Sequence, residues 1–215
     1  MKILVFGATG KTGREITQQA LLNGDEVVAY VRHPEKLTNQ TGLTIIGGQL
    51  NETKRINHAM QGVDAVLVAL GAVNNSGVEI MAPAVSTIIA VAQQAGVKRL
   101  IVLSALGVAE TIANTAYPYK VTVQTFLAKK FLDHDKAMRL LQASELDWTT
   151  IHPGLLLNGD ETANLVVKNA AMSGKVTGWA YTNRADVAAT MLRVVSDLTT
   201  VGQQLLVLSN AKSKA

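Results

Sequence analysis

Three glycines spaced three residues apart, directly after a short apolar run, constrain the fold of this chain most strongly. Residues 3–6 read I-L-V-F, the pattern of a strand buried on both faces, and Gly7, Gly10 and Gly13 follow. Apolar residues at helical spacing continue after the third glycine. A strand, a glycine turn and a helix can hold a pyrophosphate, because backbone N–H groups and the helix dipole face the anion. The sequence therefore predicts a dinucleotide site at this turn.

The spacing G-x-x-G-x-x-G places the first glycine one residue earlier than the common G-x-G-x-x-G fingerprint does. The alternative interpretation is that the glycines serve only the geometry of the turn. We favour a nucleotide site because the glycines lie between a predicted strand and a predicted helix. The residues of the turn that we expect to bind the cofactor are Gly7, Thr9, Gly10, Lys11, Thr12 and Gly13.

Strands and helices alternate along the rest of the chain, which predicts an α/β fold with a Rossmann-like, doubly wound parallel sheet. We expect residues 1–215 to form a single domain with a small C-terminal substrate lobe, built mainly from residues 107–125 and 155–183. Residues 107–125 read as irregular and are a candidate lid or substrate loop. Further strands are predicted at residues 26–32, 43–48, 65–70, 100–103, 148–151 and 205–208, and helices around residues 53–61, 130–144 and 185–196, with another that ends at Gly96.

Composition excludes several classes of protein. Hydrophobic residues make up 48% of the chain and there is no cysteine, which excludes disulfides, thiolate metal sites and cysteine nucleophiles. The formal charge is +4, but the basic residues are scattered without interleaved aromatics, so we expect no nucleic-acid partner. No apolar run reaches the roughly 18 residues of a membrane span, and no cleavable signal is apparent. We expect a cytoplasmic protein without a membrane partner.

The end of the second predicted strand carries basic residues where many NAD-binding folds carry an acidic one. Arg32 ends this strand and Lys36 follows four residues later. A guanidinium can bind a 2′-phosphate through two charge-assisted bonds, whereas a carboxylate would repel it. The alternative is a solvated charge at a strand end. The position of both residues relative to the glycines favours NADP(H) as the cofactor.

Several motifs together resemble the atypical short-chain dehydrogenase/reductases, in particular the NmrA-like NAD(P)-binding proteins. They are G-A-T-G-K-T-G at 7–13, V-R-H-P-E-K-L at 31–37, V-L-S-A at 102–105, L-D-W-T-T-I-H-P-G at 146–154 and N-R-A-D-V-A at 183–188. Within that group the chain is most similar to biliverdin-IXβ and flavin reductases, which also have an Asp-His pair like Asp133-His134 at a helix start. One departure is Leu155, where those reductases have a histidine.

The resemblance implies roles for residues outside the glycine turn. Gln49 and Leu50 would flank the adenine, and the strand end Ala69, Leu70 and Gly71 would lie close to the cofactor. Ser104 would lie beside the nicotinamide, and Pro153 and Gly154 would form a wall of its pocket.

The acid of ordinary short-chain dehydrogenases is absent from the sequence. None of the four tyrosines has a lysine four residues later. A conjugated acceptor such as a flavin, quinone or linear tetrapyrrole needs no such acid, so we predict NADPH-dependent hydride transfer to an acceptor of this kind. Ser104 is the first catalytic candidate, and its alternative is a hydroxyl satisfied by backbone. His134 and Lys136 are weaker candidates, because both also read as surface residues of a helix.

No metal site is expected. Side chains one or two residues apart on a helix point to different faces, so Asp133, His134 and Asp135 cannot converge on one ion. His33 and His58 read as surface residues and His152 as a packing residue at a strand end.

Two alternatives to a reductase remain from the sequence. The first is a non-catalytic NAD(P)-sensing regulator of the NmrA type, and the second is a sugar epimerase-like extended reductase. The absence of a tyrosine with a lysine four residues later fits a sensor as well as it fits a flavin or quinone reductase. The same absence argues against an epimerase. As partners we expect a small-molecule hydride acceptor, with the protein a monomer or a weak homodimer.

Overall fold

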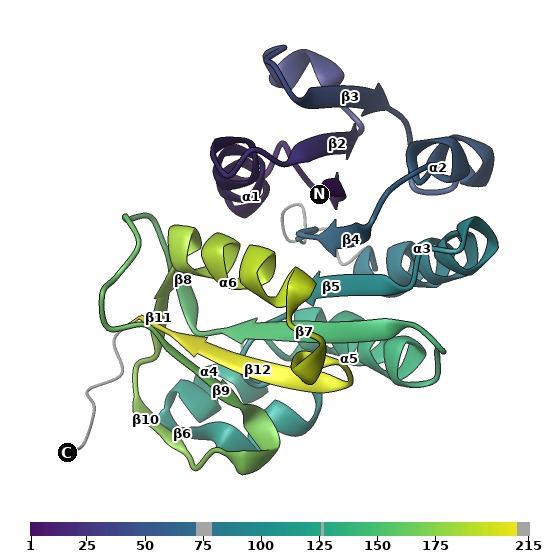
Figure 1. Cartoon of the computed structure of the whole chain (residues 1–215). Helices are drawn as coiled ribbons and strands as arrows, with labels where there is room; N and C mark the ends of the chain where they lie inside the picture. The colour runs from purple at the N-terminus through teal and green to yellow at the C-terminus, as the bar shows by residue number, and fades with distance from the viewer. Residues whose placement is uncertain (72–78, 126, 210–215) are drawn as a thin grey trace.

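A computed structural model of the chain describes residues 1–71, 79–125 and 127–209. It contains an eight-stranded sheet in the order β3-β2-β1-β4-β5-β7-β12-β9, and every neighbouring pair is parallel except β12 and β9 (Figure 1). The predicted doubly wound sheet is confirmed, with an antiparallel strand added at one edge. The strands are β1 (Lys2–Phe6), β2 (Glu26–Val31), β3 (Leu43–Gly47), β4 (Ala65–Val68), β5 (Arg99–Leu103), β7 (Asp147–Pro153), β9 (Val166–Asn169) and β12 (Gln203–Leu208).

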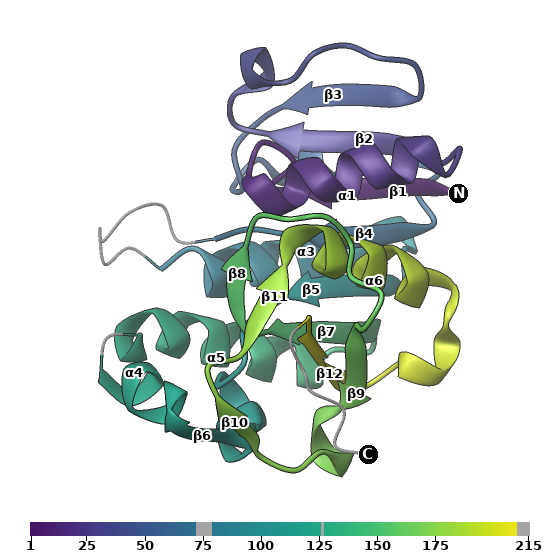
Figure 2. The same ribbon diagram turned by 90° about the vertical axis from the view of Figure 1, so that its left-hand side faces the viewer.

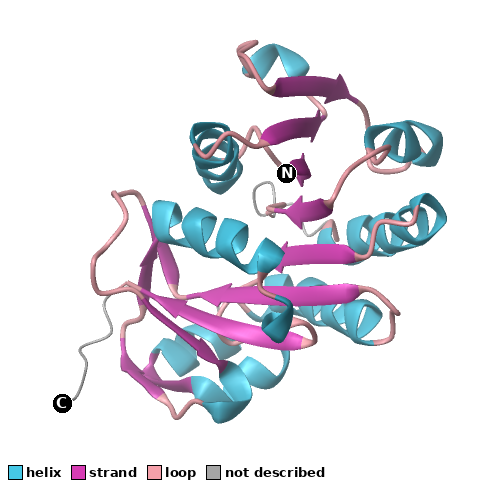
Figure 3. Cartoon of the chain, in the orientation of Figure 1, coloured by secondary structure: helices cyan, strands magenta, loops and turns pink. Residues whose placement is uncertain are grey.

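Helices cover both faces of the sheet (Figure 3). On one face, α1 (Lys11–Leu22) packs against α6 (Arg184–Ser196), and on the other α3 (Met81–Ala95) packs between α2 (Thr53–Ala59) and α5 (Ala128–Gln142). Each layer encloses its own aliphatic core, because strands buried on both faces supply apolar side chains to both sides. Gly96 ends α3 in the left-handed conformation, as its position in the sequence predicts.

The first strand lies at the point where the connections of the sheet change direction. β1 pairs with β2 on one side and with β4 on the other. Connections to the two neighbours therefore leave in opposite directions, which opens a crevice at the carboxyl ends of these strands. The glycine turn comes directly after β1 and so lies at this crevice.

The prediction that residues 107–125 are irregular is wrong. They form the 3-10 helix η2 (Ala109–Asn114), β6 (Thr115–Pro118) and α4 (Tyr119–Thr125). β6 pairs with β10 (Val176–Gly178), a contact between residues about 60 positions apart that leaves no local signal in the sequence. Segments 107–125 and 155–183 therefore do lie side by side in part (Figure 2).

The other small sheet lies across the carboxyl ends of the central strands. β8 (Leu155–Leu157) pairs in parallel with β11 (Tyr181–Asn183), and Figure 2 shows both in front of β5. Two further 3-10 helices, η3 (Ala170–Met172) and η4 (Leu198–Thr200), flank β12, and η1 (Pro34–Lys36) follows β2. Among the described residues, no helix is long and apolar enough to cross a membrane.

Candidate functional site

Close backbone contacts require glycine at two of the three positions of the turn, Gly7 and Gly13. Gly7 has a φ of +86°, and a Cβ on it would lie 2.5 Å from the carbonyl oxygen of Ala69. A Cβ on Gly13 would lie 2.1 Å from the carbonyl oxygen of Gly7. The Gly10 N–H donates to that same carbonyl at 2.9 Å and Gly10 caps the N-terminus of α1. The helix start is thus pressed against the strand end, which leaves its N-terminal N–H groups facing the crevice.

A cavity of about 650 Å³ lies in this crevice, at the carboxyl ends of β1, β2 and β4. Glycines and apolar residues line it together with polar ones, among them the cations Arg32 and Lys36 and the amides Gln49 and Asn51. Ten of the predicted cofactor-binding residues line it: Gly7, Thr9, Gly10, Arg32, Lys36, Gln49, Leu50, Ala69, Leu70 and Gly71. The other six do not line it: Lys11, Thr12, Gly13, Ser104, Pro153 and Gly154.

Three of these six lie in the first turn of α1. Lys11 is exposed, whereas Thr12 and Gly13 are buried against the strand end. Gly13 therefore contributes to the site by allowing the start of α1 to pack closely against the turn after β1.

The basic end of the cavity contains Arg32 and Lys36, both exposed. Neither forms an ion pair with any described carboxylate, and Glu35 between them bonds instead to His33 at 3.1 Å. Two cations without carboxylate partners at the rim of a cavity suit an anionic group there. The cavity therefore has a positive end beside β2.

Arg14 joins the glycine turn to the segment that carries Lys36, and sequence reasoning did not single it out. Its Nε donates to the Thr9 carbonyl at 3.3 Å and its Nη2 to the Lys36 carbonyl at 2.8 Å. A guanidinium between the two walls fixes their separation. Its position one residue after the third glycine was the available signal.

Tyr30 supports the wall that carries Gln49, and sequence reasoning missed this role too. Its hydroxyl donates to the Gln49 carbonyl at 2.9 Å, and the Glu52 carboxylate accepts from the Gln49 N–H at 2.5 Å. A Cβ on Gly48 would lie 2.2 Å from the Tyr30 hydroxyl oxygen, so a larger residue there would displace the Tyr30 side chain. These contacts hold the β3–α2 connection open toward the cavity.

Ser104 comes directly after β5, and its side chain is 7% exposed. Its hydroxyl has no hydrogen-bond partner among the described residues, so the alternative of a hydroxyl satisfied by backbone is wrong. The backbone here continues the pairing with β7, since the Ser104 N–H donates to Ile151 and the Leu106 N–H to Pro153, each at 2.8 Å. An unpaired buried hydroxyl costs stability, which points to a ligand as its partner.

Pro153 and Gly154 lie beside this strand end and are both buried. A Cβ on Gly154 would lie 2.4 Å from the Ala180 carbonyl oxygen, so the strand end and the small β8–β11 sheet are in close contact. Both residues thus lie beside the strand end of Ser104 but do not line the 650 Å³ cavity, and their place in a nicotinamide pocket stays a prediction.

Asp133 and His134 do not begin a helix, which corrects the prediction. Both lie in the middle of α5, and the Asp133 carboxylate instead accepts from the N–H groups of Ile80, Met81 and Ala82 at 2.7–2.8 Å. It therefore caps the N-terminus of α3. Those three bonds lower the pKa of the carboxyl group despite the opposing effect of burial.

The neighbouring side chains of α5 bind other partners. The Asp135 carboxylate accepts from the Ala109 N–H at 2.6 Å, and Lys136 forms an ion pair with Glu79, which lines the cavity. His134 is half-buried, and burial lowers its pKa against the opposing fields of the two aspartates. Lys136 thus reaches the cavity rim through Glu79, and neither it nor His134 lines the cavity.

No group of three or more His, Asp or Glu side chains that could hold a metal ion occurs within the described parts of the chain. His33 and His58 are exposed and His152 is fully buried, as predicted.

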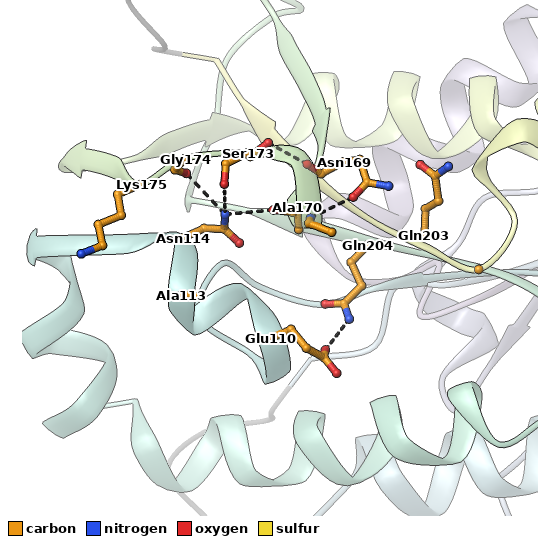
Figure 4. Close-up of a pocket in the computed structure, with 12 residues that line it drawn as sticks. Glu110, Ala113, Asn114, Asn169, Ala170, Ser173, Gly174, Lys175, Gln203 and Gln204 are labelled. Atoms are coloured by element: carbon orange, nitrogen blue, oxygen red, sulfur yellow. Dashed lines mark hydrogen bonds between the residues drawn. The ribbon is translucent and has the colours of Figure 1, made fainter.

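A second cavity, of about 550 Å³, lies between η2, η3 and the start of β12, away from every predicted site residue (Figure 4). Several of its polar groups are hydrogen-bonded, whereas the buried Gln204 Oε1 has no partner among the described residues. The Asn114 amide donates to the carbonyls of Ala170, Ser173 and Gly174, and Gln204 donates to Glu110. This last bond is the main reason that the pKa of Glu110 is lowered.

The residues present at the crevice fit a dinucleotide. The glycines leave room that a Cβ would fill, the cations are at one end, and a buried hydroxyl without a partner lies at the neighbouring strand end. A sequence profile of the NAD(P)H-binding family matches residues 7–198. The chain belongs to this family. The specificity of the family for NAD(P)H agrees with the predicted dinucleotide site.

Relatives of known sequence include oxidoreductases and an assembly factor. The photosystem II assembly factor Ycf39 of Synechocystis is 28% identical over 91% of this chain and 58% of its own length. A (4-alkanoyl-5-oxo-2,5-dihydrofuran-3-yl)methyl phosphate reductase of Streptomyces griseus is 32% identical over 70% of this chain and 46% of its own length. The chain thus spans about half the length of these relatives.

Solved structures share the fold across nearly the whole chain. ChuY, an anaerobilin reductase of Escherichia coli O157:H7, superimposes with a TM-score of 0.80 at 24% identity, and the match covers 100% of both chains. A short-chain dehydrogenase/reductase of Veillonella parvula in complex with NADP superimposes with a TM-score of 0.82 at 15% identity, over 98% of this chain and 95% of that one. At these identities the likeness shows the fold alone.

Proposed function

We propose that the chain is an NADPH-dependent reductase that transfers a hydride to a planar conjugated acceptor, such as a flavin, quinone or linear tetrapyrrole. The observation that carries the proposal is the buried Ser104 hydroxyl, at a strand end next to the crevice, which has no partner in the part of the chain that the structure describes. NADPH would supply the hydride. The glycine turn would hold its pyrophosphate, Arg32 and Lys36 its 2′-phosphate, and Gln49 and Leu50 would flank its adenine.

The Ser104 hydroxyl would donate to the nicotinamide carboxamide or to an acceptor oxygen. Two of the four tyrosines are bonded to backbone, since Tyr119 donates to the Leu106 carbonyl at 3.1 Å and Tyr30 to the Gln49 carbonyl. A conjugated acceptor spreads the added charge and can take its proton from water, so positioning supplies much of the rate. The Streptomyces reductase among the relatives supports this class of reaction.

The test is NADPH oxidation, followed by absorbance, with flavins, quinones and linear tetrapyrroles as acceptors. We expect turnover with at least one of them, and Ser104→Ala to lower kcat about tenfold or more while the Kd for NADPH changes little, because an orienting bond matters most in the transition state. Ser196→Ala, exposed at the far end of α6, is the matched control. Tight NADPH binding without oxidation of any acceptor would contradict the proposal.

The choice of cofactor gives a second prediction. Arg32→Ala is expected to weaken NADPH binding about tenfold or more and to leave NADH binding nearly unchanged, since a charge-assisted bond is worth roughly 1.5–3 kcal/mol. Titration of both cofactors into wild type and variant measures this. Lys98→Ala removes an exposed cation at the start of β5, away from the cavity, and should change neither affinity. Equal wild-type affinities for the two cofactors would refute the assignment.

One observation favours a second candidate, a cofactor-binding protein that does not turn over. The Synechocystis assembly factor Ycf39 matches 91% of this chain. A protein of that kind would bind NADPH with the same turn and cations, and Ser104→Ala would change no rate. The acceptor screen separates the two candidates. An epimerase-like activity has less support, because it relies on the acid that none of the tyrosines supplies with a lysine four residues later.

A further inference from the structure

Beyond the crevice, His152 is buried in a polar network that no step of the proposed reaction uses. It lies in β7, next to the strand end that carries Ser104, and its side chain is fully buried. Its Nδ1 lies 2.9 Å from the Ala105 carbonyl oxygen and its Nε2 lies 2.9 Å from the Thr150 hydroxyl. Both ring nitrogens of a fully buried histidine need a partner, and this ring has one on each.

The partners determine which ring nitrogen carries the proton. A carbonyl oxygen can only accept, so Nδ1 must donate to Ala105. Nε2 of the neutral ring then accepts from the Thr150 hydroxyl. Burial lowers the pKa of His152 from 6.5 to about 4, which keeps the ring neutral at physiological pH. The Nδ1–H group of His152, which donates to the Ala105 carbonyl, is therefore present in the folded protein near neutral pH.

The Ala105 carbonyl belongs to the residue directly after Ser104. The backbone on either side of it is bonded to β7, through the N–H groups of Ser104 and Leu106. The carbonyl between them accepts from the Val108 N–H at 3.2 Å and, more closely, from the His152 Nδ1 at 2.9 Å. Without the bond from His152, the carbonyl would keep only the longer bond, and the turn that follows Ser104 would be held less firmly.

The segment that follows is held by side chains as well. Ala109 has a φ of +50°, which is unusual for a residue other than glycine. The Asp135 carboxylate binds its N–H, and the Thr111 hydroxyl accepts from the Gly107 N–H at 2.9 Å. A strained backbone persists only where its surroundings hold it, and such places concentrate at functional sites.

We infer that His152 is a positioning residue, which fixes the unpartnered Ser104 hydroxyl through the Ala105 carbonyl. This rests on the proposed function, because the hydroxyl must act on cofactor or acceptor for its direction to matter. Charged groups around the ring do not replace this bond: Glu110 and His134 act on it only through their fields.

The activity test is a double-mutant cycle between His152 and Ser104. We expect His152→Leu to lower kcat about tenfold and to leave the Kd for NADPH nearly unchanged. In the Ser104→Ala protein, the same substitution should lower kcat by less than about twofold. His152→Asn should recover most of kcat, because its amide can donate to Ala105. Additive effects in the cycle, or failure of the asparagine to outperform the leucine, would overturn the inference.

A second variant, Thr150→Val, tests the same network if His152→Leu does not fold. Thr150→Val keeps the shape of the side chain and removes the bond to Nε2, so only the bonds at Nδ1 still hold the ring. We expect a smaller fall in kcat in the same direction, about threefold. His58→Leu, at an exposed position of α2, is the control for loss of a histidine. A wild-type kcat in Thr150→Val would contradict the network.

A nuclear magnetic resonance experiment tests the geometry without turnover. In the wild-type protein, the imidazole ¹⁵N spectrum should show a protonated Nδ1 and an unprotonated Nε2 at neutral pH. In His152→Asn and Thr150→Val, the amide signals of Ser104 and Leu106 should shift, while those of β1 stay in place. If these signals do not move, the inference fails. If they move but no acceptor is reduced, the proposed function fails and the positioning of Ser104 stands.

Discussion

Gly13→Ala is expected to weaken NADPH binding at least about 100-fold or to destabilise the fold by roughly 1–3 kcal/mol, because overpacked backbone cannot relax locally. The added Cβ would lie 2.1 Å from the Gly7 carbonyl oxygen and 2.8 Å from the Ala8 Cα, both backbone atoms. The start of α1 must then move away from β1. Its N-terminal N–H groups would move with it and leave the position that the pyrophosphate requires.

Two measurements separate the binding effect from the stability effect: the Kd for NADPH from fluorescence, and the free energy of unfolding from urea titration. Gly10→Ala provides a graded comparison, since its Cβ would lie 3.2 Å from the Gly7 carbonyl and should cost less. Gly174→Ala is the control, because a Cβ there meets nothing within 4 Å and the φ is not positive. If Gly13→Ala matches this control in both measurements, the glycine turn is not the cofactor site.

Short-range patterns were sufficient for the fold and for the crevice. The glycine turn, the strand ends at Arg32 and Ala69 and the order of elements are encoded within a few residues each, and the structure places ten predicted residues around one cavity. The strand end at Ser104 was predicted by the same means. What could not be predicted was the unpartnered state of its hydroxyl, because that depends on all its neighbours at once.

The errors and omissions concern contacts between residues far apart in the chain. Asp133 caps a helix that begins about 50 residues earlier, so its local sequence indicated a helix start instead. β6 pairs with a segment about 60 residues later, and alone it read as irregular. His152 was identified as a packing residue, yet its bond to Ala105 spans 47 positions. Side chains that bind distant backbone leave no period in the sequence.

Lowering the pH from 7 to 5 is expected to reduce the free energy of unfolding by about 2 kcal/mol through His152 alone. Its pKa is about 4 in the folded protein and 6.5 ordinarily, so the unfolded chain binds the proton first as the pH falls. The stabilisation is complete above pH 6.5 and is lost between 6.5 and 4. Burial also lowers the pKa of His134, which adds a loss of the same sign.

The lowered pKa values of carboxyl groups act at lower pH and do not obscure this range. Asp133 and Glu110 contribute stability that is complete above their ordinary values of 3.8 and 4.5 and disappears below them. Urea unfolding at several pH values between 7 and 5 therefore reports mainly on the histidines. His152→Asn should be less stable at pH 7 and should lose less of its stability on acidification, whereas His58→Asn should follow the wild type. Parallel curves for His152→Asn and wild type would show that His152 is not the buried neutral group, because removal of a group with a pKa of about 4 must flatten the curve.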